Sequence, residues 1–146
     1  MNKLALAAFL LMILSGCVSA PEDQDLQNRM AVAAKSLGNN FKFFYVPSDG
    51  VIANSTFIAM SKSSGPSSTA RQLASAISEG ANSSYRLAVS GPSSAKTFQV
   101  IKDAFGLLNG RKLTHLEFMY VGGVSDRDEI KSIVESAGGT FVFAPY

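Results

Sequence analysis

The sequence has no tryptophan, one histidine and one cysteine among its 146 residues. A lone cysteine excludes an internal disulfide, and the lone His115 gives little support for a zinc site or a serine triad. Asp126, Asp128 and Glu129 fit the first turn of a helix better than the longer oxygen-ligand loop of calcium sites. Thirteen Lys and Arg balance eleven Asp and Glu without a long block of either sign. We therefore expect no metal, no cofactor and no nucleic-acid partner.

The N-terminus combines a positive charge at Lys3 with an almost unbroken apolar run from residue 4 to residue 14. That run has the length of a signal peptide and is too short to span a bilayer. It is followed directly by Leu14-Ser15-Gly16-Cys17. Small residues at 15 and 16 let a peptidase approach the backbone, and the thiol of Cys17 is a nucleophile that can accept a lipid.

This pattern resembles the lipobox of bacterial lipoproteins. The resemblance implies cleavage between Gly16 and Cys17, and a diacylglyceryl group and further acyl chains such as palmitate on Cys17. Two or more chains anchor a protein stably where one chain is marginal. In that family an Asp after the cysteine often retains the protein in the inner membrane, whereas Val18 stands here. The resemblance therefore implies the periplasmic face of the outer membrane, with the inner membrane or a cell surface left open.

Three segments are expected: a signal peptide over 1–16, a lipidated tether over 17–24 and one domain over 25–146. Removal of the first segment leaves 130 of the 146 residues, which is enough for one core and too few for two. The tether residues are small and polar and include Pro21. The domain is therefore expected to lie close to the membrane.

Apolar spacing in the remaining chain predicts an α/β fold. Turn residues 47–50 separate a strand from a second β-branched run, which predicts an antiparallel hairpin. Beyond it, strands and helices alternate, which favours parallel pairing through right-handed crossovers. We expect a single domain with a mixed, mostly parallel sheet of about five strands and flanking helices; helices on one face only are the alternative. The expected helices are 25–37, 66–79, 93–108 and 126–137, and the expected strands are 41–46, 51–60, 85–89, 116–121 and 140–144.

The tetrapeptide Gly-Pro-Ser-Ser occurs at 65–68 and again at 91–94, each time before an expected helix. Proline and serine are typical of helix starts, because serine oxygens accept the first free amides. The second copy, with Lys96-Thr97 after it, superficially resembles a P-loop. A P-loop needs a second glycine where Ala95 stands, and Gly91 lies one residue too close to the lysine. A capped helix start is the favoured interpretation, with a weak anion site as the alternative.

Loops that follow parallel strands often face ligands. By this analogy, two loops of the predicted domain form a candidate rim for a ligand or a partner. The candidate rim consists of Ser90, Gly91, Ser93, Ser94, Gly122 and Ser125.

The sequence favours a non-enzymatic function. A strong anchor joined to a compact domain without a catalytic set is typical of an accessory or assembly component of an envelope machine, of the secretion, conjugation or pilus type. Such a protein acts through protein–protein interaction. A small-ligand or cell-wall-binding module is the alternative, and a hydrolase that uses Ser90 or the carboxylates is the third hypothesis.

Overall fold

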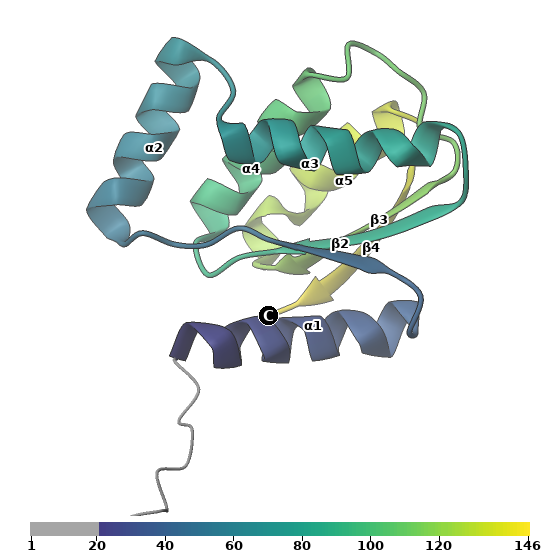
Figure 1. The fold of residues 1–146 in the computed structure, drawn as a ribbon, viewed down its shortest axis with the longest axis horizontal. Helices are drawn as coiled ribbons and strands as arrows, with labels where there is room; N and C mark the ends of the chain where they lie inside the picture. The colour runs from purple at the N-terminus through teal and green to yellow at the C-terminus, as the bar shows by residue number, and fades with distance from the viewer. Residues whose placement is uncertain (1–20) are drawn as a thin grey trace, which may run out of the picture.

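The computed structural model describes residues 21–146, so the expected signal peptide, the segment that resembles a lipobox and Cys17 lie outside the described residues. This part of the chain forms a single α/β domain (Figure 1). Two short 3-10 helices accompany the longer elements. In chain order the elements are α1 (Pro21–Leu37), β1 (Lys42–Tyr45), α2 (Val51–Ser64), α3 (Ser68–Ser78), η1 (Glu79–Ala81), β2 (Tyr85–Ser90), α4 (Ser94–Gly106), β3 (Leu116–Gly122), η2 (Val124–Asp126), α5 (Arg127–Ser136) and β4 (Thr140–Pro145).

The four strands form one parallel sheet in the order β1-β2-β3-β4. Every strand therefore ends at the same side of the sheet, here called the carboxyl end. Helices α3, α4 and α5 cover one face and α1 covers the other (Figure 1). The predicted parallel pairing is confirmed. The alternative arrangement, with helices on one face only, is wrong. Because the strand order never reverses, the sheet lacks the crevice that a reversal opens in doubly wound folds.

Two apolar layers hold the sheet between its helices. The larger layer joins the sheet to α3, α4 and α5 and includes Leu73, Ile101, Phe118, Tyr120 and Ile130, all almost fully buried. The smaller layer lies beneath α1 and contains Ala33, Leu37, Ala88, Met119, Val121 and Ala144. The side chains on this face are mostly small, so α1 can approach the strands closely.

Helix α1 begins at Pro21, four residues before the expected start, so residues 21–24 of the expected tether are helical. Proline suits the first helical turn because its missing amide has no intrahelical partner there. Glu22 and Asp23 also favour this position beside the positive end of the helix dipole. Within this helix Met30 is exposed and Arg29 is buried.

The predicted antiparallel hairpin and fifth strand are wrong. Residues 51–64 form α2, and the sheet of the described chain has four strands. The turn is real, with Gly50 at a φ of 93°. However, the Asn54 side chain bonds back to Ser48 Oγ at 2.8 Å and to the Asp49 amide at 3.2 Å, which closes the loop as a helix entry. The helix also places Ser61 against Asp103 of α4, a contact between helices.

Both Gly-Pro-Ser-Ser segments start helices, as predicted. Ser67 and Ser93 are the N-cap residues, and their side chains accept hydrogen bonds from the amides of Ala70 and Lys96. The prolines precede the caps and so lie outside the first turn. Helix α5 starts differently, because η2 leads directly into it and Asp126 makes no side-chain cap bond.

Candidate functional site

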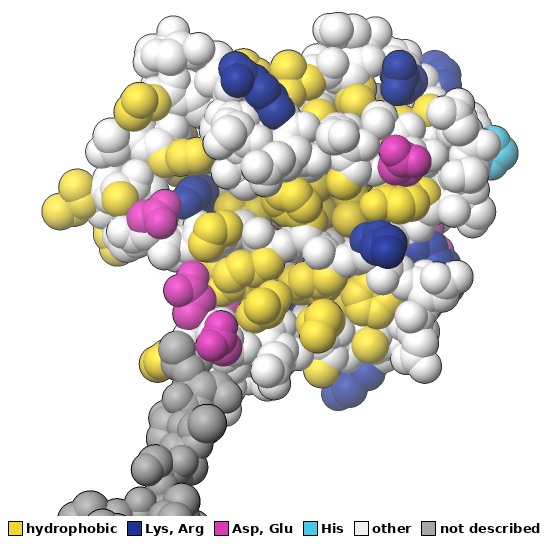
Figure 2. All heavy atoms as spheres, in the orientation of Figure 1, with side chains coloured by type: hydrophobic (Ala, Val, Ile, Leu, Met, Phe, Trp, Pro, Cys, Tyr) yellow, Lys and Arg dark blue, Asp and Glu magenta, His cyan; other side chains and the backbone are white. Residues whose placement is uncertain are grey.

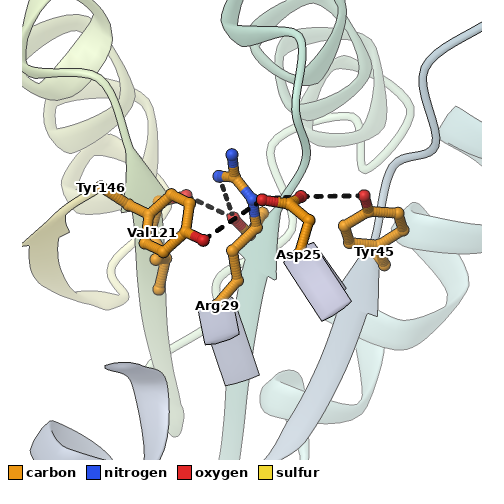
Figure 3. A network of polar contacts seen from close by, with 6 residues as sticks. Asp25, Arg29, Tyr45, Val121 and Tyr146 are labelled. Atoms are coloured by element: carbon orange, nitrogen blue, oxygen red, sulfur yellow. Dashed lines mark hydrogen bonds and ion pairs between the residues drawn. The ribbon is translucent and has the colours of Figure 1, made fainter. Parts of the chain in front are cut away.

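A partly buried polar network lies where α1 crosses the carboxyl end of the sheet (Figure 3). Arg29 of α1 donates from Nε to Asp25 Oδ2 at 2.7 Å and from a terminal nitrogen to Ser90 Oγ at 3.0 Å. Ser90 in turn donates to the carbonyl oxygen of Val121 at 2.6 Å. The network therefore connects α1 with the ends of β2 and β3.

Two tyrosines complete this network from the outer strands. Tyr45, the last residue of β1, donates its hydroxyl to Asp25 Oδ2 at 3.0 Å. Tyr146, which follows β4, donates to Asp25 Oδ1 at 3.2 Å, and its ring lies 4.0 Å from the Arg29 guanidinium carbon. All four strands thus contribute to the network at their carboxyl ends.

The charges in the network stabilise each other. Burial alone would raise the pKa of Asp25, but hydrogen bonds from Arg29, Tyr45 and Tyr146 outweigh it and hold that pKa below its ordinary value. Burial and the bond to the Asp25 carboxylate raise the pKa of Tyr45 to about 12. The stable state is therefore ionised Asp25 beside neutral Tyr45, with both carboxylate oxygens accepting bonds.

This arrangement suits a structural role, in which the network holds α1 against the sheet. The Asp25 carboxylate accepts three hydrogen bonds, and the buried Ser90 hydroxyl directs its proton at a backbone carbonyl. Sequence reasoning missed the roles of Asp25 and Arg29. The available signal was their i, i+4 spacing on the same helical stripe as Ala33 and Leu37, which places both polar side chains against the sheet.

The structure separates the residues of the candidate rim. Ser90, Gly91 and Gly122 are buried, whereas Ser93 is half-buried and Ser94 and Ser125 are exposed. Gly123 lies between Ser94 and Ser125. A Cβ atom built on this glycine would lie 3.3 Å from the hydroxyl oxygen of Ser94 and 3.6 Å from that of Ser125. A ligand or partner at this rim stays a prediction, and only Ser93, Ser94 and Ser125 of the rim are accessible.

The stretch that superficially resembles a P-loop has structural partners. Lys96 is buried, and its Nζ lies 2.6 Å from Asp49 Oδ2 and 4.9 Å from the centre of the Phe57 ring. The lysine therefore joins α4 to the loop before α2. A Cβ on Gly91 would overlap the carbonyl oxygen of Val46 and the hydroxyl of the buried Thr97. Glycine is required here because β1 and α4 meet at this point.

Gly91→Ala should therefore lower the free energy of unfolding by about 1–3 kcal/mol, the usual cost of overpacking. Gly106→Ala is the matched control, because nothing lies within 4 Å of its added Cβ. Alanine at this helical position should leave stability unchanged or raise it by about 0.5 kcal/mol. Urea unfolding of both variants measures the difference, and equal stability would contradict a close contact at Gly91.

The outer edge of β1 is an open strand edge with apolar side chains on both of its faces. Val46 donates its amide to Ser90 O at 2.8 Å, so by alternation the backbone groups of Phe43 and Tyr45 face away from β2. Half-buried Phe41 and Phe43 lie on the α1 side, and half-buried Phe44 lies on the other. Figure 2 shows hydrophobic side chains above and below β1 on this face. Such an edge can pair with another strand.

A hollow of about 410 Å³ lies between α4 and α5. Phe105, Leu108 and Ile133 give it an apolar floor, with Lys102, Arg111 and Glu129 around it. Helix α4 starts at the carboxyl end and returns across the sheet, so this hollow lies toward the opposite end, away from the candidate rim. Its size falls within the range of small-molecule sites.

Other site chemistries find no support among residues 21–146. No three His, Cys, Asp or Glu side chains in that range come together as a metal site, and His115 is exposed. In the same range no helix combines the length and apolar character needed to cross a bilayer. Comparison of the chain with protein-family models, curated proteins and solved structures gives no match.

Proposed function

We propose that this protein is a lipoprotein, anchored through Cys17 at the periplasmic face of the outer membrane, that binds another envelope protein without catalysing a reaction. The observation that carries the proposal is the segment Leu14-Ser15-Gly16-Cys17, only four residues before the helix that starts at Pro21. A short attachment of this kind places a rigid domain beside the membrane. The partner belongs to an envelope machine such as a secretion, conjugation or pilus apparatus.

The open edge of β1 supports a specific binding mode. An extended segment of the partner would add a strand beside β1, with main-chain hydrogen bonds to Phe43 and Tyr45. The flanking phenylalanines would supply apolar contacts on both faces of the added strand. Lys42 is the only charged side chain in the strand, so little on β1 itself opposes pairing. The expected partner segment is extended and apolar, with an acidic residue opposite Lys42.

Site-specific photo-cross-linking tests this binding mode. We would replace Lys42 with p-benzoylphenylalanine in the full chain and irradiate intact cells. Thr140 is the matched control, because it is the exposed first residue of β4, the other edge strand. The expected result is one adduct of defined mass with an envelope protein from position 42, and none from position 140.

Two outcomes would contradict the binding mode. Equal labelling from both positions, or none from position 42, would show that the β1 edge is not the docking surface. An adduct of twice the chain mass would identify a second copy of this chain as the occupant, and would replace the heterologous partner by self-association.

A small-ligand module is the second candidate function, and the hollow between α4 and α5 favours it. A ligand that binds only the native state raises the melting temperature. Ser132→Arg would fill this hollow from its exposed lining, and Ser75→Arg on the exposed surface of α3 is the matched control. A compound that stabilises the wild type and Ser75→Arg, but not Ser132→Arg, would favour this second function.

A further inference from the structure

Four exposed apolar side chains lie at the carboxyl end of the sheet. Val51 and Ile52 of α2 are 84% and 85% exposed, Val124 of η2 is 59% exposed, and Tyr146 is 47% exposed. They follow β1, β3 and β4, which all end at this side. These are four of the seven large hydrophobic residues that are exposed among residues 21–146. Exposed apolar side chains at one end of a domain are suited to contact with an apolar environment.

Helix α1 starts at this same end. Its residue Asp25 contacts Tyr45 and Tyr146 at the carboxyl end, whereas the carbonyl oxygen of Leu37 accepts a 2.9 Å bond from Arg86 near the start of β2. The helix therefore runs opposite to the strands. Figure 1 shows the beginnings of α1 and α2 at the same side of the molecule.

The attachment is short enough to fix which surface meets the membrane. Cys17 precedes Pro21 by four residues, and four residues span at most about 14 Å when fully extended. A lipid on Cys17 would thus keep the carboxyl end of the sheet close to the leaflet, at a distance set by the length of this short attachment. The opposite end, with exposed Leu107, lies across the length of the strands from the attachment.

The first turns of α2 are suited to an apolar environment. No charged residue occurs between Val51 and Ser61. The hydroxyls of Ser55 and Thr56 donate to the carbonyl oxygens of Val51 and Ile52, each at 3.0 Å. These side chains therefore satisfy their own hydrogen-bond donors within the helix and present little polarity outward.

We infer that the carboxyl end of the sheet rests on the lipid leaflet, with Val51 and Ile52 inserted among the lipids and Tyr146 at the headgroup level. This inference rests on the proposed attachment through Cys17. Tyrosine suits such an interface because its ring is apolar and its hydroxyl is polar. The carboxyl ends of the strands then point toward the membrane, and the outer edge of β1 remains open to a partner that approaches from the side.

The charged side chains at this end determine whether the domain prefers zwitterionic or anionic lipid. Glu22 and Asp23 lie in the first turn of α1 at this end, and Figure 2 shows acidic side chains between α1 and α2. An anionic surface would repel them. The contact is therefore expected on zwitterionic lipid and should weaken as anionic lipid is added.

The absence of tryptophan makes a direct test possible, because a single introduced tryptophan is the only indole in the chain. We would place it at Ile52, at Met60 in the same helix, and at Leu107 across the sheet, and reconstitute each acylated protein in phosphatidylcholine vesicles. Ile52→Trp should emit at shorter wavelength and lose intensity when brominated lipids replace the ordinary ones. Leu107→Trp should show neither change, and Met60→Trp should be quenched less than Ile52→Trp.

Three outcomes would overturn the inference. One is unshifted emission from Ile52→Trp, and another is equal quenching at Ile52 and Leu107. The third is a shift that brominated lipids do not quench and that grows with protein concentration, which would assign the surface to a second copy of the chain.

The intact mass of the same samples separates this inference from the proposed attachment. A mass without acyl chains would contradict the attachment. In that case, coupling the thiol of Cys17 to a maleimide headgroup on the vesicles would supply a tether of similar length. Lipid quenching at Ile52 would then support the membrane-facing surface, and its absence would reject it.

Discussion

Asp25→Ala should lower the free energy of unfolding by about 3 kcal/mol, the cost of leaving a buried cation without its carboxylate partner. The Arg29 guanidinium is buried between α1 and the sheet, and Asp25 accepts its Nε hydrogen. The hydroxyls of Tyr45 and Tyr146 lose their acceptor in the same variant. Urea unfolding followed by circular dichroism measures the loss.

Two further variants test the cause of that loss. Asp23→Ala removes an exposed carboxylate from the same helical turn and should cost less than about 1 kcal/mol. The double variant Asp25→Ala/Arg29→Met leaves no buried charge without a partner, so it should cost less than the sum of its single changes. Strict additivity would show that the two residues do not act as a pair.

The loss should also depend on pH in a defined direction. The pKa of Asp25 is depressed in the folded protein, so its stabilising contribution is present above the ordinary value of 3.8 and disappears as the pH falls through the lower folded value. The gap between wild type and Asp25→Ala should therefore close in acid. At the alkaline side, the raised pKa of Tyr45 contributes stability that is lost between pH 10 and about 12, and Tyr45→Phe should lack this loss.

Cys17→Ser should abolish acylation completely, the largest effect that the account predicts. Serine has no thiol to accept the diacylglyceryl group, so an alkyne fatty acid fed to the cells should label the wild type and leave the variant unlabelled. The variant should also disappear from the outer-membrane fraction, because stable anchoring needs two or more chains. Ser19→Ala, two residues away, should label like the wild type. Persistent label on Cys17→Ser would place the lipid elsewhere.

The part of the fold in which strands and helices alternate was predictable from the sequence, because each element there shows a clear hydrophobic periodicity. Strands β2, β3 and β4 and helices α3, α4 and α5 lie within a few residues of their expected ranges. Residues 51–60 misled the prediction, since Val51, Ile52, Thr56 and Ile58 all favour strands locally. Their helix depends on the side chain of Asn54 and on packing against α4, which local propensity does not contain.

The candidate site was less predictable, because it is built from contacts between distant segments. Ser90 was expected on an accessible loop, and instead it ends an inner strand beneath Arg29, which lies 61 residues earlier in the chain. Nothing in the sequence near Ser90 indicates this partner. The strand order, which brings Tyr45, Ser90, Val121 and Tyr146 to one side, was likewise left open by the sequence. The hydrophobic periodicity of the sequence predicts individual helices and strands, whereas this network depends on how those helices and strands are arranged in space.

The intact mass of the protein extracted from outer membranes tests the central claim most directly. The expected species is a chain that begins at Cys17 and carries a diacylglyceryl group and a further acyl chain. A chain of all 146 residues with a free thiol at position 17 would contradict it.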